Sequence, residues 1–233
     1  MISLSMLPLS LIEKMARDLK IAPLNIIREH LEMETLYYLS QSKLSENLIF
    51  YGGTALRLAY NSFRFSEDLD FLFIKKLKDS KKELSQALKL VAANNPGVKV
   101  EEIFDKRQTL FGLLHIKHEL LKHPIRIKIE ICKKKNGVET ENTLLISPTS
   151  NKEIIFPTAT SESIFKAKKE AIKNRETARD WFDFWYLANK LKSEEKINKK
   201  FPFAEKEFKN ELKRWLPQDK WKIIDTIIKF YES

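Results

Sequence analysis

Hydrophobic and polar positions follow two periods along this chain, and each period predicts a different kind of element. Near both ends, apolar residues such as Ile26, Ile27 and Leu31 recur at the spacing of an amphipathic helix. These stripes predict helices that pack against a core. The predicted helices cover residues 8–19, 23–40, 54–61, about 80–93, and 161 to the end of the chain.

The middle of the chain alternates apolar and polar residues with period two, which predicts strands. In the clearest case, Ile127 and Ile129 alternate with Arg126, Lys128 and Glu130, so one side of the strand faces a core and the other is charged. The predicted strands cover residues 48–51, 68–73, 98–104, 110–118 and 124–132, with 144–146 as one more.

These elements predict an α+β fold, in which a mixed β-sheet flanked by helices is followed by a C-terminal helical bundle. With 233 residues the chain can bury a substantial core. Pro148 and Pro157 bracket a segment that we interpret as a linker. We therefore expect a sheet-bearing domain, including the N-terminal helices, over residues 1–156 and a helical domain over residues 157–233.

A glycine pair follows the first predicted strand. Gly52 and Gly53 let the backbone turn where a side chain would clash, and Thr54 then opens a helix. Such a turn leaves unpaired N–H groups at a helix N-terminus, where the helix dipole favours phosphate oxygens. The pattern predicts a phosphate-binding turn, to which the Thr54 hydroxyl adds a donor.

Two aspartates begin the next predicted strand. Because side chains alternate along a strand, Asp68 and Asp70 lie on one face. Neighbouring carboxylates repel unless a cation lies between them, and oxygen ligands suit Mg²⁺, which also shares substrate phosphates. Each motif alone has an ordinary interpretation, a common turn or a solvated strand face. Their order along the chain favours a site for a nucleoside triphosphate and Mg²⁺.

This order of motifs resembles the nucleotidyltransferase superfamily with a polymerase-beta-like core, and within it the AbiEii/AbiGii-type toxins of abortive-infection and toxin–antitoxin systems. The first family block stands here as Gly52-Gly53-Thr54-Ala55-Leu56, followed by Arg64-Phe65-Ser66-Glu67-Asp68-Leu69-Asp70. The second stands as Lys168, followed by Arg175-Glu176-Thr177-Ala178-Arg179-Asp180-Trp181-Phe182-Asp183. The resemblance covers the chain from about Leu24 to Leu191.

The resemblance implies an enzyme that transfers a nucleoside monophosphate from a triphosphate to RNA, such as a tRNA 3′ end, and so inhibits growth. It also implies an antitoxin protein as partner, and contacts from Arg64 and Ser66 to the triphosphate. Members of the superfamily place a third acid on a neighbouring strand, where it completes the metal site or accepts the proton of the attacking hydroxyl. Glu130 is the candidate, although a glutamate between two basic neighbours also fits a solvated strand face.

The densest group of basic residues in the chain surrounds Glu130 and extends from Lys122 to Lys135. This group forms a possible binding surface for an RNA backbone. The predicted RNA-binding residues are Arg126, Lys128, Lys133, Lys134 and Lys135.

One lysine of the predicted helix that begins at residue 161 points toward the core. Lys168 lies on the apolar arc with Ile164 and Ile172, whereas Lys169 is turned about 100° further round. An inward lysine needs an anionic partner, which a nucleotide phosphate would supply, unless its ammonium group reaches solvent along the aliphatic stem.

Two further acids lie on the helix that follows. Asp180 and Asp183 are one turn apart on the same side, and we expect them to orient Lys168 or Arg179. The residues predicted to take part in catalysis are Asp68, Asp70, Glu130, Lys168, Asp180 and Asp183.

Composition narrows the class of protein. Lys and Arg total 42 against 32 Asp and Glu, and the net charge of +10 favours a polyanionic partner such as RNA. The single cysteine, Cys132, excludes an internal disulfide framework and fits a reducing cytoplasm. The N-terminal segment lacks the features of a signal peptide, and no apolar run reaches bilayer length. We therefore expect a cytoplasmic enzyme with no membrane partner.

Three other functions stay open at this level. A transferase that modifies a small molecule or a protein would not need the basic residues around Glu130. A metal-dependent nuclease could use the same aspartates but has no evident use for the glycine turn. An RNA-binding module with a relict site would not need to keep its acidic residues.

Overall fold

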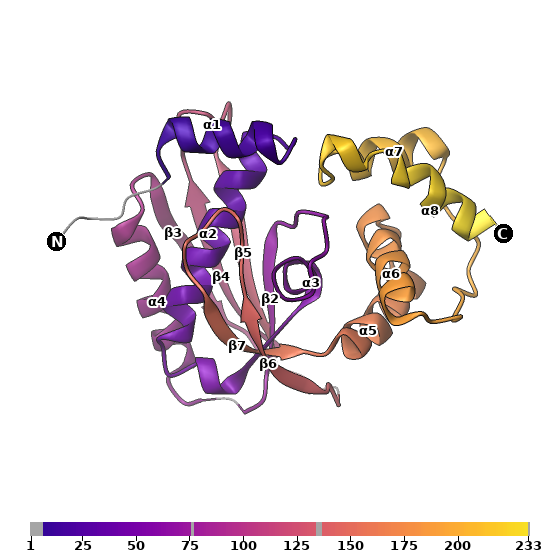
Figure 1. The fold of residues 1–233 in the computed structure, drawn as a ribbon. Helices are drawn as coiled ribbons and strands as arrows, with labels where there is room; N and C mark the ends of the chain where they lie inside the picture. Colours follow the sequence, from indigo (N-terminus) through magenta and orange to yellow (C-terminus); the bar gives the residue numbers. More distant parts are fainter. Residues whose placement is uncertain (1–6, 76, 134–136, 233) are drawn as a thin grey trace.

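The computed structural model describes residues 7–75, 77–133 and 137–232, and it has the predicted α+β architecture. A lobe built on a sheet is joined to a lobe of C-terminal helices (Figure 1). The helices are α1 (Leu9–Asp18), α2 (Pro23–Ser40), α3 (Gly52–Tyr60), α4 (Ser80–Asn94), α5 (Ser161–Asn174), α6 (Ala178–Leu191), α7 (Glu205–Lys213) and α8 (Ile223–Glu232), with 3-10 turns η1 (Ser45–Asn47) and η2 (Gln218–Lys220). The strands are β1 (Leu48–Tyr51), β2 (Asp68–Phe73), β3 (Val98–Asp105), β4 (Thr109–Ile116), β5 (Ile125–Cys132), β6 (Thr140–Leu145) and β7 (Ile154–Ala159).

The sheet is mixed, as the sequence predicted, with strand order β3-β4-β5-β2-β1-β7-β6. The β2–β5 and β1–β7 pairs are parallel, and the other pairs are antiparallel. The β2–β5 register places Asp68 opposite Lys128 and Asp70 opposite Glu130. Since residues paired in this way point to the same side, acids and bases from distant parts of the sequence share one face of the sheet.

The opposite face of the sheet carries the core. Phe50 of β1 packs against Phe71 of β2, with ring centroids 5.2 Å apart, and both contact Phe156 of β7. Helix α4 covers this face so closely that a side chain at Gly112 of β4 would collide with Leu88. The predicted alternation of buried and exposed positions on these strands is therefore confirmed.

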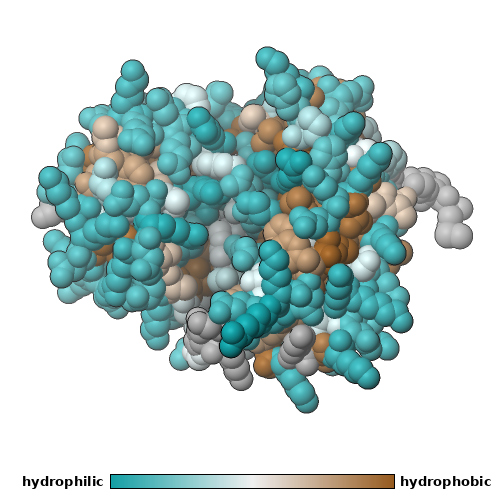
Figure 2. All heavy atoms as spheres, turned by 180° about the vertical axis from the view of Figure 1, so that it is seen from behind, coloured by the Kyte–Doolittle hydropathy of each residue, from teal (hydrophilic) through white to brown (hydrophobic). Residues whose placement is uncertain are grey.

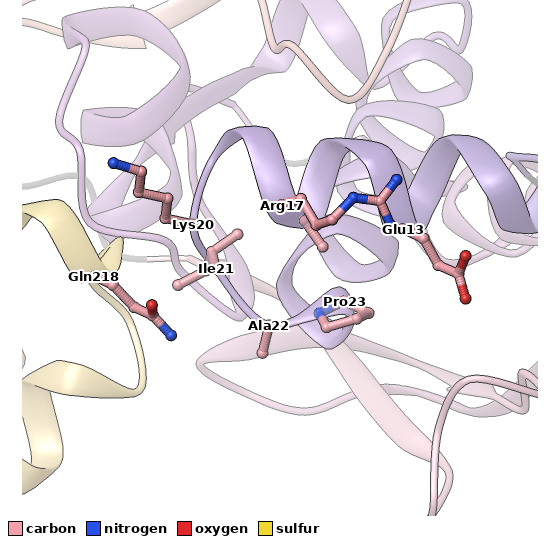
Figure 3. Close-up of a pocket in the computed structure, with 8 residues that line it drawn as sticks. Glu13, Arg17, Lys20, Ile21, Ala22, Pro23 and Gln218 are labelled. Carbon is pink, nitrogen blue, oxygen red and sulfur yellow. The ribbon is translucent and has the colours of Figure 1, made fainter.

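The C-terminal lobe returns to the first lobe after α7. The Trp215 carbonyl accepts a hydrogen bond from the Phe65 N–H at 2.8 Å, and the Gln218 N–H donates to the Lys20 carbonyl at 2.9 Å. Figure 3 shows Gln218 facing the segment that joins α1 to α2, across a pocket of about 640 Å³. The two lobes are thus joined by these two backbone hydrogen bonds as well as by the chain connection from β7 to α5.

The linker predicted between the two prolines is correct only in part, because residues 148–153 form a loop but the segment that follows is a strand. Residues Ile154–Ala159 form β7, which lies inside the sheet and places Thr158 opposite Phe50 of β1. The strand was not predicted because of Pro157. Proline has no N–H to donate to the hydrogen bonds between strands, so it usually argues against an interior strand. Phe156, where the boundary between domains was expected, is fully buried in the sheet. We therefore propose that the division between the two parts of the chain lies after Ala159.

Within the described ranges, no helix has both the length and the apolar character that crossing a bilayer requires.

Candidate active site

The two motif aspartates stand at the wall of a cavity between the lobes. Asp68 and Asp70 of β2 are half-buried, and on the neighbouring strand β5 their partners Lys128 and Glu130 are exposed. The cavity has a volume of about 310 Å³. Its lining residues are Gly53, Arg64, Ser66, Glu67, Asp68, Asp70, Lys128, Glu130, Lys168, Arg175, Thr177, Arg179 and Asp180.

The glycine pair lies in the first turn of α3, which begins at Gly52 and not at Thr54 as predicted. Gly52 has a φ of +86°, a conformation that side chains other than glycine rarely adopt, and a Cβ there would collide with the Asp70 carboxylate. A Cβ at Gly53 would lie 2.5 Å from Arg64 Nη2 and 2.8 Å from Ser66 Oγ. Glycine is needed at both positions because the side chains of Asp70, Arg64 and Ser66 approach the backbone of the glycine pair so closely.

The Thr54 hydroxyl does not face the cavity. It donates to the Asp68 carbonyl at 2.5 Å, and the whole residue is buried. The prediction that this hydroxyl adds a phosphate donor is therefore wrong in this structure. Thr54 instead ties the first turn of α3 to the start of β2, which fixes the backbone that carries the aspartates.

Arg64 is also occupied by protein groups. Its Nε and Nη2 donate to the two carboxylate oxygens of Asp183 at 2.8 Å each, and its Nη1 donates to the Phe65 carbonyl at 2.8 Å. Both charged side chains are almost completely buried. The geometry gives Arg64 a structural role between the lobes, and because Arg64 also lines the cavity, its expected contact with a phosphate stays a prediction.

Lys168 joins the same buried network, and its Nζ lies 2.8 Å from Asp180 Oδ1 and 2.7 Å from Asp183 Oδ2. The expected contact between these aspartates and Lys168 is confirmed. Asp180 also accepts hydrogen bonds from Arg175 Nε at 2.6 Å and from the Thr177 hydroxyl at 2.6 Å. Asp183 is fully buried and does not line the cavity, whereas Asp180 does.

The charges of this network control its titration. Burial alone would raise the pKa of Asp180 and Asp183, but the neighbouring charges of Lys168 and Arg64 and the hydrogen bonds outweigh burial and lower both pKa values. Burial alone would lower the pKa of Lys168, and the two carboxylates instead raise it. All three side chains are therefore ionised in the folded protein at neutral pH.

The surroundings of the motif aspartates Asp68 and Asp70 raise their pKa values, in contrast to those of Asp180 and Asp183. Burial, followed by the charges of Asp68 and Glu130, raises the pKa of Asp70 to about 6, although Lys168 works against this shift. Burial also raises the pKa of Asp68, and Lys128, with Nζ 3.9 Å away, partly opposes it. Negative charge at this point of the cavity is thus only partly compensated by the protein.

The predicted RNA-binding residues differ in their surroundings. Lys128 lines the cavity, whereas Arg126 donates from Nε to Glu101 at 2.8 Å and Lys133 pairs with Asp105. The other predicted members of the group, Lys134 and Lys135, lie outside the described residues. The described part of this basic group is therefore continuous with the cavity only at Lys128.

Two arginines in the lining were not among the predicted site residues. Arg175 follows α5, and its side chain is 60% exposed above the cavity. Arg179 of α6 pairs with Glu67 across the cavity, with Nη1 2.5 Å from Oε1. Both belong to the second family block in the sequence, so the signal was present, but only the fold shows that they face the aspartates.

Among the described residues, no group of three or more His, Cys, Asp and Glu side chains is arranged to hold a metal ion.

Comparisons with known proteins agree with the fold and the motifs. The fold is similar to that of MenT4, a nucleotidyltransferase toxin from Mycobacterium tuberculosis H37Rv, with a TM-score of 0.59 and 20% identity over 88% of this chain and 69% of that chain. It is also similar to JHP933 from Helicobacter pylori, with a TM-score of 0.53 and 22% identity over 91% of this chain and 80% of that chain. No curated protein matches the sequence.

A family model gives the more specific result. Residues 34–222 match the model described as nucleotidyl transferase AbiEii toxin, type IV toxin–antitoxin system. The match spans both motif blocks and most of the chain. The chain belongs to this AbiEii family of nucleotidyltransferase toxins.

Proposed function

We propose that the protein transfers a nucleoside monophosphate from a triphosphate bound with Mg²⁺ to a hydroxyl of RNA, such as a tRNA 3′ end. One observation carries the proposal. Asp68 and Asp70 stand in a cavity that also contains the cations Lys128, Arg175 and Arg179. Phosphoryl transfer depends on positioning and on charge stabilisation, so it needs carboxylates for a metal and cations for phosphate oxygens in the same place.

Asp68 and Asp70 would hold the Mg²⁺. Their raised pKa values support this role, because a divalent cation would offset the negative charge that burial and proximity make unfavourable. Two carboxylates are a suitable protein contribution for Mg²⁺, which takes further oxygens from phosphates and water. When bound, the metal supplies charge neutralisation at the transferred phosphoryl group.

Other groups of the chain would bind and orient the reactants. The N–H groups in the first turn of α3, at Gly52 and Gly53, have no intrahelical partner, and together with the Ser66 hydroxyl they suit phosphate oxygens. Gly53 and Ser66 both line the cavity. Arg175 has both Nε and Nη2 bonded to Asp180, which holds its guanidinium in place and leaves Nη1 for a phosphate. Glu130, exposed and directly opposite Asp70, would accept the proton of the attacking hydroxyl.

Lys168 would act at the back of the cavity. Its charge already interacts with Asp70, and the carboxylates of Asp180 and Asp183 fix its position. A fixed, partly desolvated cation stabilises charge that develops during transfer without needing to reorganise. Asp180 and Asp183 thus serve as positioning residues for Lys168. Asp180 also positions Arg175, and Asp183 also positions Arg64.

The net charge of +10 and the exposed Lys128 at the cavity support a polyanionic acceptor. Membership of a toxin–antitoxin family supports growth inhibition as the outcome and an antitoxin protein as the partner.

The test is to incubate the protein with each labelled nucleoside triphosphate and total RNA, with and without Mg²⁺, beside the Asp70→Asn variant. The expected result is label in RNA that requires both Mg²⁺ and Asp70. Label in the protein itself or in small molecules would replace RNA as the acceptor. RNA fragments formed without any triphosphate would show a nuclease instead.

A further inference from the structure

Two phenylalanine rings stack on the same face of the sheet as the motif aspartates. Phe104 of β3 lies opposite Phe111 of β4, their ring centroids are 4.6 Å apart, and the ring planes differ by 13°. Both residues are half-buried. The Lys106 ammonium group lies 4.4 Å from the Phe104 ring centroid. No part of the function described above uses these rings.

The sheet register places this pair in line with the active site. Phe111 is opposite Glu130 of β5, and Glu130 is opposite Asp70 of β2. Since neighbouring strands are about 4.8 Å apart, the Phe111 backbone lies about 10 Å from that of Asp70. A single strand whose terminal hydroxyl reaches Glu130 and Asp70 would carry its last bases over this part of the sheet.

The pair is part of the surface of the sheet beside the strand that carries Glu130. Phe104 stacks on Phe111 and has the Lys106 ammonium group near its ring, whereas Phe111 is half-buried and lies opposite Glu130 of β5. Lys128, on the same face of β5, is exposed and borders the cavity. Seen from behind, apolar surface on the lobe that carries the sheet is surrounded by hydrophilic side chains (Figure 2). Partly exposed aromatic rings with a lysine near each end of the group are complementary to a base with its flanking phosphates.

We infer that Phe111, backed by Phe104, is the stacking surface for an unpaired base at the end of a single-stranded RNA acceptor, and that Lys106 and Lys128 contact the flanking phosphates. This inference rests on the proposed function for the identity of the acceptor. Base stacking on an aromatic ring tolerates different sequences, so the surface selects an unpaired end and not a particular base. A duplex end presents no free base and would not fit.

Binding of a short single-stranded RNA tests the inference without any triphosphate. We would place 2-aminopurine at either of the last two nucleotides of the 3′ end and measure fluorescence and affinity. The wild-type protein should quench the probe. Phe111→Leu keeps an apolar contact with Phe104 but removes the ring, and should weaken binding about 5- to 100-fold and abolish the quenching. Phe111→Tyr keeps the ring and should retain both.

The matched control is Ile155→Ala, which removes a 70% exposed apolar side chain from β7, on the other side of β1. It should leave RNA binding unchanged. Absence of quenching by the wild-type protein would overturn the inference even if Phe111→Leu folds poorly. Equal affinity of wild type and a folded Phe111→Leu would also overturn it, as would equal affinity for single-stranded and duplex RNA.

Failure of the proposed function would look different. If Phe111 binds the RNA end but labelled nucleotide is never transferred to RNA, the stacking surface stands and the reaction is wrong. If transfer to RNA requires Asp70 but Phe111→Leu neither weakens binding nor changes quenching, the reaction stands and the stacking surface is wrong.

Discussion

Arg64 and Asp183, 119 positions apart in the sequence, form a two-pronged ion pair in which two nitrogens of the guanidinium donate to both carboxylate oxygens at 2.8 Å. Arg64 precedes the motif aspartates, and Asp183 belongs to helix α6 of the C-terminal lobe. The pair is buried, so water does not compete for its two hydrogen bonds. It joins the two halves of the candidate active site and continues through Lys168 to Asp180.

We predict that Lys168→Met and Lys169→Met differ sharply in stability as well as in activity. Removing one member of a buried ionic network leaves uncompensated charge, and with Arg64 and Arg175 still in place we expect a loss of about 2–4 kcal/mol. This corresponds to a fall in Tm of roughly 5–15 °C. Lys169 forms a pair with the exposed Glu195, and its replacement should cost less than about 1 kcal/mol. Thermal unfolding of the two variants would measure this, and similar melting points would contradict the structural role of Lys168.

We predict that Asp70→Asn abolishes nucleotide transfer but raises thermal stability at neutral pH. Activity is lost because the amide cannot replace a carboxylate ligand, whereas its shape is retained. Stability rises because the carboxylate is partly desolvated and lies near Asp68 and Glu130. We expect a gain of about 1–3 kcal/mol, since each pKa unit corresponds to about 1.4 kcal/mol. Transfer assays and melting curves without metal would test both parts, and an active variant would refute the metal assignment.

The pH dependence of that gain has a definite direction. The pKa of Asp70 is about 6 in the folded protein and higher than its ordinary value, so the folded state binds more protons than the unfolded state between those two values. Wild-type protein therefore loses stability relative to Asp70→Asn as the pH rises from about 4 to above 6. The difference in Tm between the two proteins, measured without metal, should be largest above pH 7 and should vanish near pH 4. A constant difference would show that the shift has another cause.

Gly52→Ala should be more harmful than Gly137→Ala, although both glycines have positive φ. A Cβ at Gly52 would collide with the Asp70 carboxylate, whereas a Cβ at Gly137 would meet nothing within 4 Å. Both variants carry the backbone penalty of about 1 kcal/mol or more. Only Gly52→Ala should also displace Asp70 and suppress transfer. Comparison of Tm and turnover for the two variants separates backbone strain, which both share, from displacement of Asp70, which only Gly52→Ala causes. Full activity of Gly52→Ala would argue against the close contact between Gly52 and Asp70.

Lys128→Ala should weaken RNA binding and reduce its salt dependence by about one unit of slope, because one phosphate contact is lost. Lys173→Ala is a matched control, since Lys173 is exposed on α5, pairs with Glu170 and is not among the residues that line the cavity. Affinity measured between low and moderate salt tests both variants. An unchanged slope for Lys128→Ala would remove this residue from the RNA-binding surface.

Local sequence was sufficient for the elements that carry the motifs. The apolar run before the glycine pair and the alternation around Asp68 and Asp70 predicted strands that the structure contains, because side-chain period reflects which face is buried. The inward position of Lys168 followed in the same way from its angle on the helix. It was the pairing of Lys168 with both aspartates that required the packing of α5 against α6.

The structure decided what distant residues do to one another. β7 was missed because Pro157 argues against a strand, while the burial of Phe156 within the sheet outweighs that local preference. Thr54 and Arg64 looked like phosphate ligands by their place in the motif, but the Thr54 hydroxyl donates to the Asp68 carbonyl, and Arg64 donates two of its hydrogen bonds to Asp183. The sequence by itself determined which residues carry charge and on which face of an element they lie. Only tertiary structure decided which charges neutralise each other and which still face the cavity, because strand pairing and lobe packing set those distances.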